Sequence, residues 1–356
     1  MFASVHDPEV LSPAELDAYL AQGWFRMGPT IFTTNFLSFK ENLYSAIWLR
    51  VDLAEYRGEK TQAKLFKSNS LFTTRIQRAT VTDEKEQLFA RYKASVPFEA
   101  SASLQHLLFG KSYATAFDTY EVSVSHEGKL IAVGYFDLGK EAGMGISSIY
   151  HPDFKKYSLG KYLIYLKMDY CRQLGMRYFY PGYFVPGYAF FDYKLSIGKD
   201  ALEFLQFERD EWKTIKAFNE HATPLGVMQQ KLTKLKDGLL GIGIAARITR
   251  YEFFDANLIP DLAGARLFDF PLFLIYPGAV REATLQCVTF DIREHRYHLM
   301  KCRGIWKTNS ASASDAIYSS YVLKPEDTLY STDTADDMVR TISAEYQQMT
   351  LRTGTR

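Results

Sequence analysis

The sequence has few cysteines, no long hydrophobic run and no large excess of charge. Its three cysteines, Cys171, Cys287 and Cys302, lie far apart, which argues against a disulfide framework or a zinc knuckle. No apolar run reaches the roughly 18 residues of a membrane helix, and the N-terminal residues show no secretion signal. We therefore expect a cytoplasmic protein with no membrane partner. The net charge of +1 excludes a uniformly basic nucleic-acid coat but permits a local basic patch.

The chain also lacks the short motifs of several enzyme classes. It contains no G-x-S-x-G, no H-E-x-x-H and no P-loop, so hydrolase, zinc-protease and kinase functions have no support. Among the seven histidines, His295 and His298 fit surface or structural roles better than metal ligation. We therefore expect no bound metal.

The most informative stretch runs from residue 143 to residue 194. Its pattern predicts a strand over 144–150, a helix over 159–174 and a second strand over 176–180. Ser158 is a suitable N-cap for the helix, and Pro181 is expected to end the second strand because proline cannot continue a ladder. The predicted unit is therefore strand, loop, helix and strand.

The loop of this unit is basic and leads directly into the predicted helix. It comprises Lys155, Lys156, Tyr157, Ser158, Leu159 and Gly160. A helix N-terminus offers unpaired N–H groups and a positive dipole, which suit a phosphate or another anion. Gly160 would let a ligand approach the backbone closely. The alternative is that Gly160 serves packing only and that the lysines are solvated.

The order strand, basic loop, helix, strand resembles the acyl-donor segment of the GNAT acyltransferase fold. In that fold the loop holds a pyrophosphate, and the two strands splay to admit the acyl group. Several ordered segments also resemble the C-terminal half of arginyl-tRNA–protein transferases, a family that includes bacterial leucyl transferases. These segments are Ser147-Ser148-Ile149-Tyr150, Tyr157-Ser158-Leu159-Gly160, the stretch from Tyr178 to Gly187, and Tyr193-Lys194. The motif Gly23-Trp24-Phe25-Arg26-Met27-Gly28 is similar to the G-W-x-R-x-G motif near the N-terminus of that family.

The resemblance implies an α+β protein with a GNAT-like mixed central sheet. It fades after Tyr193-Lys194, and beyond about residue 219 β-rich segments broken by proline and glycine predict a smaller, mixed α/β C-terminal appendage. We expect residues 1–80 to form an N-terminal region that resembles the N-terminal domain of the family. Residues 81–218 would form the catalytic domain, and residues 219–356 the appendage.

The resemblance also implies two groups of site residues. The residues expected to contact the aminoacyl group and the reacting atoms are Ser147, Ser148, Tyr150, Tyr183, Tyr193 and Lys194. The residues expected to bind the tRNA donor are Arg26, Arg50, Lys64, Lys67, Lys155, Lys156, Ser158, Leu159 and Gly160. For the tyrosines, core packing is the alternative. For the basic run from Arg50 to Lys67, the alternative is an ordinary solvated face.

The sequence departs from the family pattern at two places. Where the family carries C-x-x-C-x-x-C, this chain has Lys40, Leu43 and Ala46, so no thiolate is left to hold a metal or an iron–sulfur cluster. Tyr188 stands where the family has a small residue, and Phe191 where it has methionine. These larger residues would either narrow a pocket or refill a core.

We therefore expect transfer of arginine or leucine from a charged tRNA to the N-terminal α-amine of a protein. An acidic acceptor residue is implied by the resemblance alone. The partners would be aminoacyl-tRNA and the acceptor protein or peptide, and no further cofactor is expected. One alternative is a GNAT-type N-acyltransferase that uses acyl-CoA. Another is a homologue that binds tRNA or peptide without catalysis.

Overall fold

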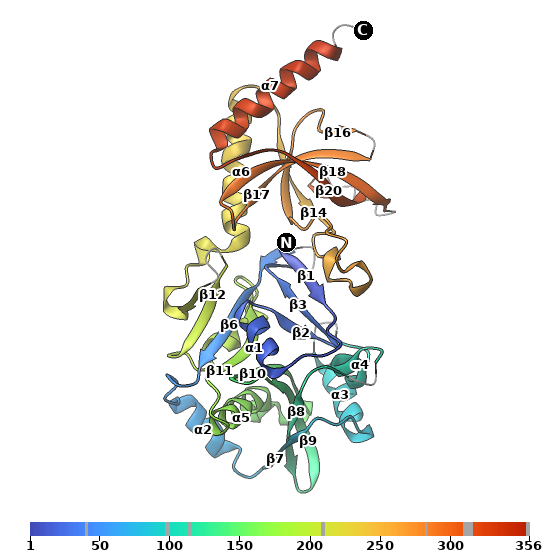
Figure 1. The fold of residues 1–356 in the computed structure, drawn as a ribbon. Helices are drawn as coiled ribbons and strands as arrows, with labels where there is room; N and C mark the ends of the chain where they lie inside the picture. The colour runs from blue at the N-terminus through green and yellow to red at the C-terminus, as the bar shows by residue number, and fades with distance from the viewer. Residues whose placement is uncertain are drawn as a thin grey trace.

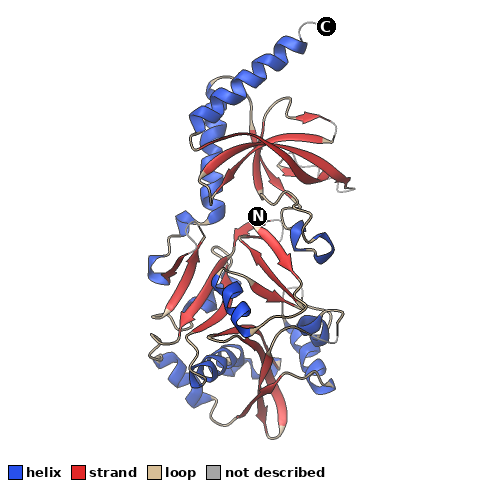
Figure 2. Ribbon diagram, viewed as in Figure 1, coloured by secondary structure: helices blue, strands red, loops and turns tan. Residues whose placement is uncertain are grey.

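Two large β-sheets, each covered by helices, make up most of the chain. The computed structural model describes residues 1–39, 42–96, 100–112, 115–207, 211–281, 283–308 and 316–353. The larger sheet lies toward one end of the molecule and the second sheet toward the other, close to the C-terminus (Figure 1; Figure 2). Within these residues, no helix combines the length and the apolar character that crossing a membrane requires.

The larger sheet has eight strands and combines parallel and antiparallel pairing. In spatial order its strands are β13 (Glu211–Thr214), β12 (Leu202–Gln206), β6 (Ile47–Asp52), β11 (Tyr178–Phe184), β10 (Ala142–Tyr150), β9 (Lys129–Leu138), β8 (Thr119–His126) and β7 (Thr73–Arg78). Only the central pair, β10 and β11, is parallel; every other neighbouring pair in this sheet is antiparallel. Because β6 and β7 belong to the first 80 residues, that region and the segment 81–218 share one sheet.

Helices cover both faces of the larger sheet. They are α1 (Pro13–Ala21), α2 (Lys60–Ser68), α3 (Asp83–Ser95), α4 (Leu104–Phe109) and α5 (Leu159–Gln173). The helix predicted over 159–174 is confirmed as α5, whose buried Leu159 and Leu163 pack with Val122 and Val124 of β8. On the other face, α3 and α4 pack against alternate residues of β9 and β10.

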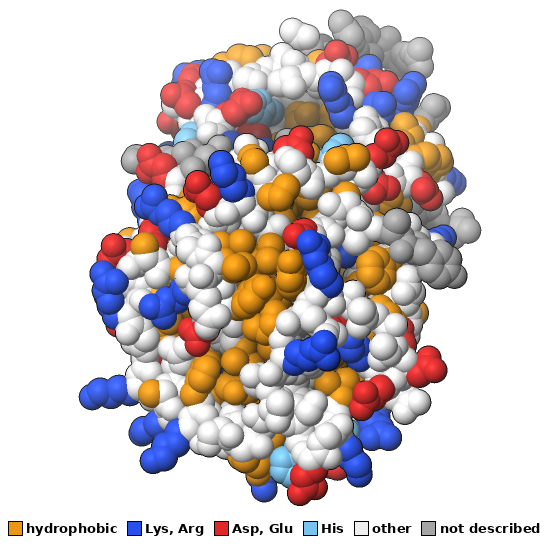
Figure 3. All heavy atoms as spheres, turned by 60° about the horizontal axis from the view of Figure 1, so that its bottom comes forward, with side chains coloured by type: hydrophobic (Ala, Val, Ile, Leu, Met, Phe, Trp, Pro, Cys, Tyr) orange, Lys and Arg blue, Asp and Glu red, His pale blue; other side chains and the backbone are white. Residues whose placement is uncertain are grey.

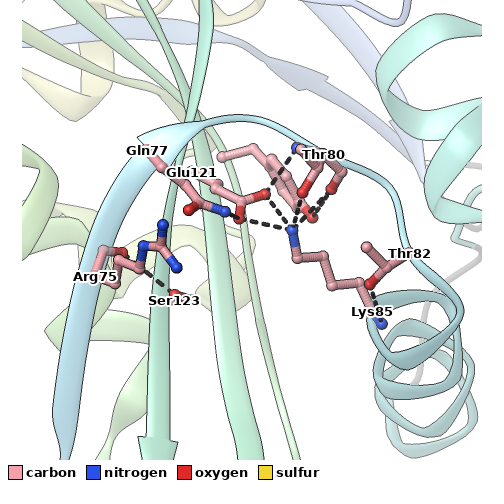
Figure 4. Close-up of polar contacts among 8 residues, drawn as sticks. Arg75, Gln77, Thr80, Thr82, Lys85, Glu121 and Ser123 are labelled. Atoms are coloured by element: carbon pink, nitrogen blue, oxygen red, sulfur yellow. Dashed lines mark hydrogen bonds and ion pairs between the residues drawn. The ribbon is translucent and has the colours of Figure 1, made fainter.

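Helix α3 is fixed to the sheet by a buried ion pair. The Nζ atom of Lys85 lies 2.6 Å from both carboxylate oxygens of Glu121 on β8, and it also donates to the carbonyl oxygen of Thr80, 3.0 Å away. Figure 4 shows Lys85 reaching from the helix into this group of polar partners. A buried ammonium is tolerated here because a carboxylate compensates its charge.

Strand β11 does not end at Pro181, contrary to the prediction. It continues to Phe184 and pairs with β6 on both sides of an irregularity between Phe179 and Gly182. The shift in register removes Pro181 from the ladder, where its missing N–H would have left a gap. Gly182 has φ +92°, a conformation that L side chains rarely adopt.

Smaller elements surround this sheet. They are a three-stranded sheet of β1 (Ala3–His6), β3 (Thr30–Thr34) and β2 (Phe25–Met27), and a hairpin of β4 (Phe36–Phe39) and β5 (Asn42–Ser45). The short 3-10 helices are η1 (Pro152–Tyr157), η2 (Ala189–Ser196), η3 (Ile215–Ala217), η4 (Glu220–Ala222), η5 (Ala256–Leu258) and η6 (Pro260–Leu262).

The second sheet is built from the C-terminal part of the chain. Its strands are β19 (Ile317–Tyr318), β14 (Arg247–Tyr251), β15 (Leu272–Ile275), β17 (Thr284–Asp291), β18 (Arg296–Lys307) and β20 (Tyr321–Thr332), with β16 (Val280–Arg281) beside β17. Helices α6 (Pro224–Gly241) and α7 (Ala335–Thr353) pack with it (Figure 1). This β-rich unit is in keeping with the predicted appendage, while the boundary at residue 219 stays a prediction.

Candidate active site

A cavity of about 740 Å³ opens where β10 and β11 separate. Their parallel pairing ends at Met144 opposite Tyr180; from there β10 stays paired with β9, and β11 continues along β6. The edge of β10 from Gly145 to Tyr150 thus faces the cavity instead of a partner strand. Residues of α3, α5 and η2 supply further walls. When the lower end of Figure 1 is turned toward the viewer, hydrophobic side chains gather in the middle of the visible face, with charged side chains around them (Figure 3).

The N-terminus of α5 borders this cavity. Ser158 holds the predicted N-cap position, but its backbone is left-handed (φ 51°, ψ 42°) and its side chain makes no capping hydrogen bond. The first N–H groups of α5 therefore lack a side-chain cap, which leaves them suited to an anionic ligand. Gly160 lines the cavity, and a Cβ atom there would lie only 3.3 Å from the ring of Tyr150. Lys155 and Lys161 also line the cavity.

Two of the lysines that line the cavity, Lys167 and Lys194, are buried. The Nζ atom of Lys194 donates to the carbonyl oxygen of Tyr183 at 2.8 Å. The Nζ atom of Lys167 donates to the carbonyl oxygen of Ser147 at 2.5 Å and to the Ser148 hydroxyl at 3.3 Å. Burial lowers the pKa of both lysines to about 7, because leaving water disfavours the charged form. Both amines therefore titrate near neutral pH.

Lys167 was missed by the sequence analysis. It lies at i+4 from Leu163 and i+8 from Leu159, both buried on α5, so its position on the apolar face of the helix could have been read from the sequence. A lysine on a buried face is a signal because such residues are rarely buried without a partner. Its contacts with Ser147 and Ser148, by contrast, depend on the tertiary structure.

The two lysines predict a stability that rises with pH. Each has a pKa of 10.5 as the reference for the unfolded chain and about 7 in the folded protein. Above pH 7 the unfolded chain therefore binds more protons than the folded one, and the free energy of unfolding rises with pH, by about 1 kcal/mol per pH unit for each lysine and about 2 kcal/mol per pH unit for the pair. Above pH 9 the raised pKa of Cys171 acts in the opposite direction.

This dependence can be measured by urea unfolding between about pH 7 and pH 8.5. The Lys167→Met and Lys194→Met variants should each show a smaller slope than the unsubstituted protein. A flat profile in the unsubstituted protein, or an unchanged slope in both variants, would contradict the assignment of these pKa values.

The predicted site tyrosines separate into two groups. Tyr150 and Tyr193 line the cavity together with Tyr92, whose ring centroid lies 5.3 Å from that of Tyr150. Burial raises the pKa of Tyr92 to about 12, so its hydroxyl stays protonated at neutral pH. Tyr183 instead packs against Trp48 and Phe191, with ring centroids 5.1 and 5.3 Å away, and it does not line the cavity. Core packing, the alternative weighed for the tyrosines, thus describes Tyr183.

The predicted donor-binding residues also fall into two groups, buried residues and exposed lysines. Arg26 is buried, pairs with Asp137 at 2.7 Å and lies outside the cavity, so a structural contact replaces its expected contact with the donor. Arg50 is mostly buried and pairs with Glu203, also at 2.7 Å. Leu159 is buried in the core, so only its backbone lies at the helix start. Exposed positions are held by Lys64 and Lys67 on α2 and by Lys155 and Lys156 on η1.

One of the two departures from the family pattern, the larger residues Tyr188 and Phe191, lies in an aromatic cluster. Phe39 of β4 stacks on Tyr188, with ring centroids 5.0 Å apart and an angle of 15° between the rings, and Phe191 lies beside both. Of the family's cysteine positions, Ala46 is buried and Leu43 packs against the C-terminal core, while Lys40 lies outside the described residues. The larger residues therefore refill a core and do not narrow the cavity.

One group of side chains has the composition of a metal site. Asp291, Glu294 and His298 offer ligand atoms within 4.8 Å of one another at the turn between β17 and β18. Within the turn, Asp291 accepts backbone N–H bonds from Arg293 and Glu294. His298 forms a 2.7 Å hydrogen bond with the Ser331 hydroxyl. These hydrogen bonds explain why the three side chains lie close together: they stabilise the turn.

Comparison with known proteins shows that the sequence around the cavity is similar to one family. The sequence profile described as arginine-tRNA-protein transferase, C terminus, matches residues 84–202, which include the cavity-lining edge of β10 and all of α5. An aspartate/glutamate leucyltransferase of Leptospira interrogans is 30% identical over 192 residues, covering 52% of this chain and 73% of the relative. The enzyme of the same name from Ruegeria pomeroyi is 28% identical over 149 residues, covering 41% of this chain and 55% of the relative.

Solved structures show weaker similarity. FemX gives a TM-score of 0.37 with 11% identity, over 55% of this chain and 69% of that chain. A GCN5-related N-acetyltransferase from Kribbella flavida gives a TM-score of 0.25 with 13% identity, over 43% of this chain and 49% of that chain.

The mixed eight-stranded sheet and the sequence matches together define an aminoacyltransferase. The chain belongs to the arginyl-tRNA–protein transferase family, which includes the aspartate/glutamate leucyltransferases. The family resemblance seen in the sequence is thereby confirmed.

Proposed function

We propose that this protein transfers leucine from leucyl-tRNA to the N-terminal α-amine of proteins whose first residue is acidic. The observation that carries the proposal is the charge of the cavity. Its described lining includes Lys155, Lys161, Lys167 and Lys194 but neither aspartate nor glutamate. A guanidinium group would find no carboxylate there, whereas an apolar side chain would meet apolar walls. The names of the relatives point in the same direction.

In the proposed reaction the acceptor α-amine attacks the ester carbonyl of the aminoacyl-tRNA. An amide bond forms, the ester bond breaks, and the 3′ oxygen of the tRNA leaves with a proton. Because the ester is already activated, the protein mainly has to hold both reactants together and stabilise the oxyanion. We assign the stabilisation of the oxyanion to the free edge of β10 and to Lys194, because both line the cavity. Tyr150 and Tyr193 also line the cavity, and we assign their hydroxyls to polar contacts with the reactants.

The donor would reach the cavity across a basic surface formed by Lys64, Lys67, Lys155 and Lys156. The two segments that carry these lysines are linked, because Asn69 donates to the carbonyl oxygen of Tyr157 at 3.1 Å. Lysines of this kind neutralise phosphates, so binding of the tRNA should weaken steeply with salt. The uncapped N-terminus of α5 would receive the last phosphate before the aminoacyl ester.

Donor selection tests the proposal. We expect kcat/KM for leucyl-tRNA to exceed that for arginyl-tRNA by about 10²-fold or more, because a guanidinium would enter the cavity without a partner. The measurement offers both donors, carrying labelled amino acids, to one peptide that begins with aspartate. Equal or preferred use of arginyl-tRNA would overturn the assignment of leucine.

An acyl-CoA-dependent acyltransferase is the second candidate. The same uncapped helix end and the same gap between diverging strands would suit a pyrophosphate and a thioester. An assay with acetyl-CoA and the same peptide separates the two functions.

A further inference from the structure

The Ser147–Ser148 segment of β10 is paired with a strand on one side only. It pairs with Tyr135 and Gly134 of β9, but past Met144 β11 no longer pairs with its other edge, so the N–H and C=O groups that point to that edge lack ladder bonds from β11. The strand is also irregular here, with a shift in register between Gly145 and Ser147. An irregular free edge positions a reacting carbonyl poorly unless another group fixes it.

Lys167 supplies the missing support from α5. It donates to the carbonyl oxygen of Ser147 at 2.5 Å and to the Ser148 hydroxyl at 3.3 Å, and its side chain is almost entirely buried. The adjacent strand makes room for it: a Cβ atom on Gly134, which pairs with Ser148, would lie 2.7 Å from Cε of Lys167. Glycine at this position thus leaves the space that the lysine occupies.

Lys167 lacks the carboxylate counterion that a buried structural lysine usually has. Among the described residues, none forms an ion pair with Lys167, whereas the other buried lysine on a helix facing this sheet, Lys85, has Glu121 as its partner (Figure 4). A buried ammonium without a carboxylate is destabilising. A group in a cleft whose burial is unfavourable in free energy is a candidate for a functional role.

We propose that Lys167 is a positioning residue, which clamps the free edge of β10 at Ser147 and Ser148 so that this edge is held rigid against the donor carbonyl. This inference rests on the proposed function, because it assigns the edge of β10 to the reacting ester. Lys167 acts through the strand and does not itself contact the substrate. Its hydrogen bonds matter for this role, and its charge does not.

The test compares Lys167→Met, which removes both bonds, with Lys167→Gln, whose amide can donate in their place. We expect Lys167→Met to lower kcat for leucyl transfer about 10²-fold, with KM for leucyl-tRNA changed much less. Lys167→Gln should recover most of that loss. Equal losses in both variants, or no loss in either, would overturn the proposal.

Thermal stability provides the matched control. Lys167→Met should raise or preserve Tm, because it removes a buried charge that has no partner. Lys85→Met should lower Tm, because it leaves Glu121 buried and uncompensated. If Lys167→Met instead lowered Tm as Lys85→Met does and left kcat unchanged, the lysine would be only structural.

Hydrogen exchange separates this inference from the proposed function. In the absence of substrate, the amides of residues 147–150 should exchange at least about tenfold faster in Lys167→Met than in the unsubstituted protein, while those of β8 stay unchanged. If the unsubstituted protein transfers no amino acid but this difference is seen, the proposed function fails and the clamp stands. If transfer is observed but exchange does not change, the clamp fails.

Discussion

Replacing Arg26 by methionine is expected to lower the free energy of unfolding by about 3–5 kcal/mol, because the change leaves a buried carboxylate without its counterion. The Nη1 atom of Arg26 lies 2.7 Å from Oδ1 of Asp137, and both side chains are completely buried. The same nitrogen donates to the Thr119 hydroxyl, and the guanidinium lies 4.4 Å from the ring centroid of Phe117. This pair links β2 to the central sheet. Urea unfolding followed by tryptophan fluorescence measures the effect.

Two further variants decide whether the ion pair is the cause. Adding Asp137→Asn to Arg26→Met should recover a substantial part of the lost stability, because the remaining partner is no longer charged. Lys301→Met, which breaks a partly exposed pair with Glu326, should cost no more than about 1 kcal/mol. A loss for Arg26→Met as small as that for Lys301→Met would contradict the buried-pair account.

The second large effect is expected on catalysis. Replacing Lys194 by methionine should lower kcat/KM for amino-acid transfer by about 10²–10³-fold, the range found when a preorganised donor to an oxyanion is removed. Lys194 lines the cavity, and its bond to the carbonyl oxygen of Tyr183 holds the ammonium beside the gap between the strands. The change should not lower the free energy of unfolding, because a buried, unpaired charge is removed.

Lys199→Met is the matched control for Lys194→Met. Lys199 lies five residues further along the chain, is exposed and does not line the cavity, so transfer should be unchanged in this variant. Steady-state rates with leucyl-tRNA and a peptide beginning with aspartate compare the two. Activity of Lys194→Met within about threefold of the unsubstituted protein would remove Lys194 from the proposed oxyanion site.

The elements around the cavity could be predicted because local patterns specify them. The sequence pattern over 159–174 predicts α5, and the basic loop before it predicts the helix end that borders the cavity. The separation of β10 from β11 is predicted from the family resemblance alone, since no local sequence pattern encodes a gap between strands. The register confirms the separation, because β10 and β11 pair only up to Met144 and Tyr180.

The directions of individual side chains could not be predicted in the same way. Arg26 lies in a motif shared with the family, yet its burial depends on Asp137, which is far away in the sequence. Tyr183 faces Trp48 and not the cavity because the register between β11 and β6 sets its direction. Strand β11 passes Pro181 because an irregularity takes the proline out of the ladder, and that irregularity has no signal of its own in the sequence.

Incubating the purified protein with leucyl-tRNA and a peptide that begins with aspartate tests the central claim most directly. Mass spectrometry of the peptide would show whether one leucine has been added and whether the α-amine carries it. We predict this product, at a rate that falls when salt is raised, and no acetylated peptide when acetyl-CoA replaces the charged tRNA. Acetylation without any transfer of leucine would contradict the account, as would an unmodified peptide with both donors.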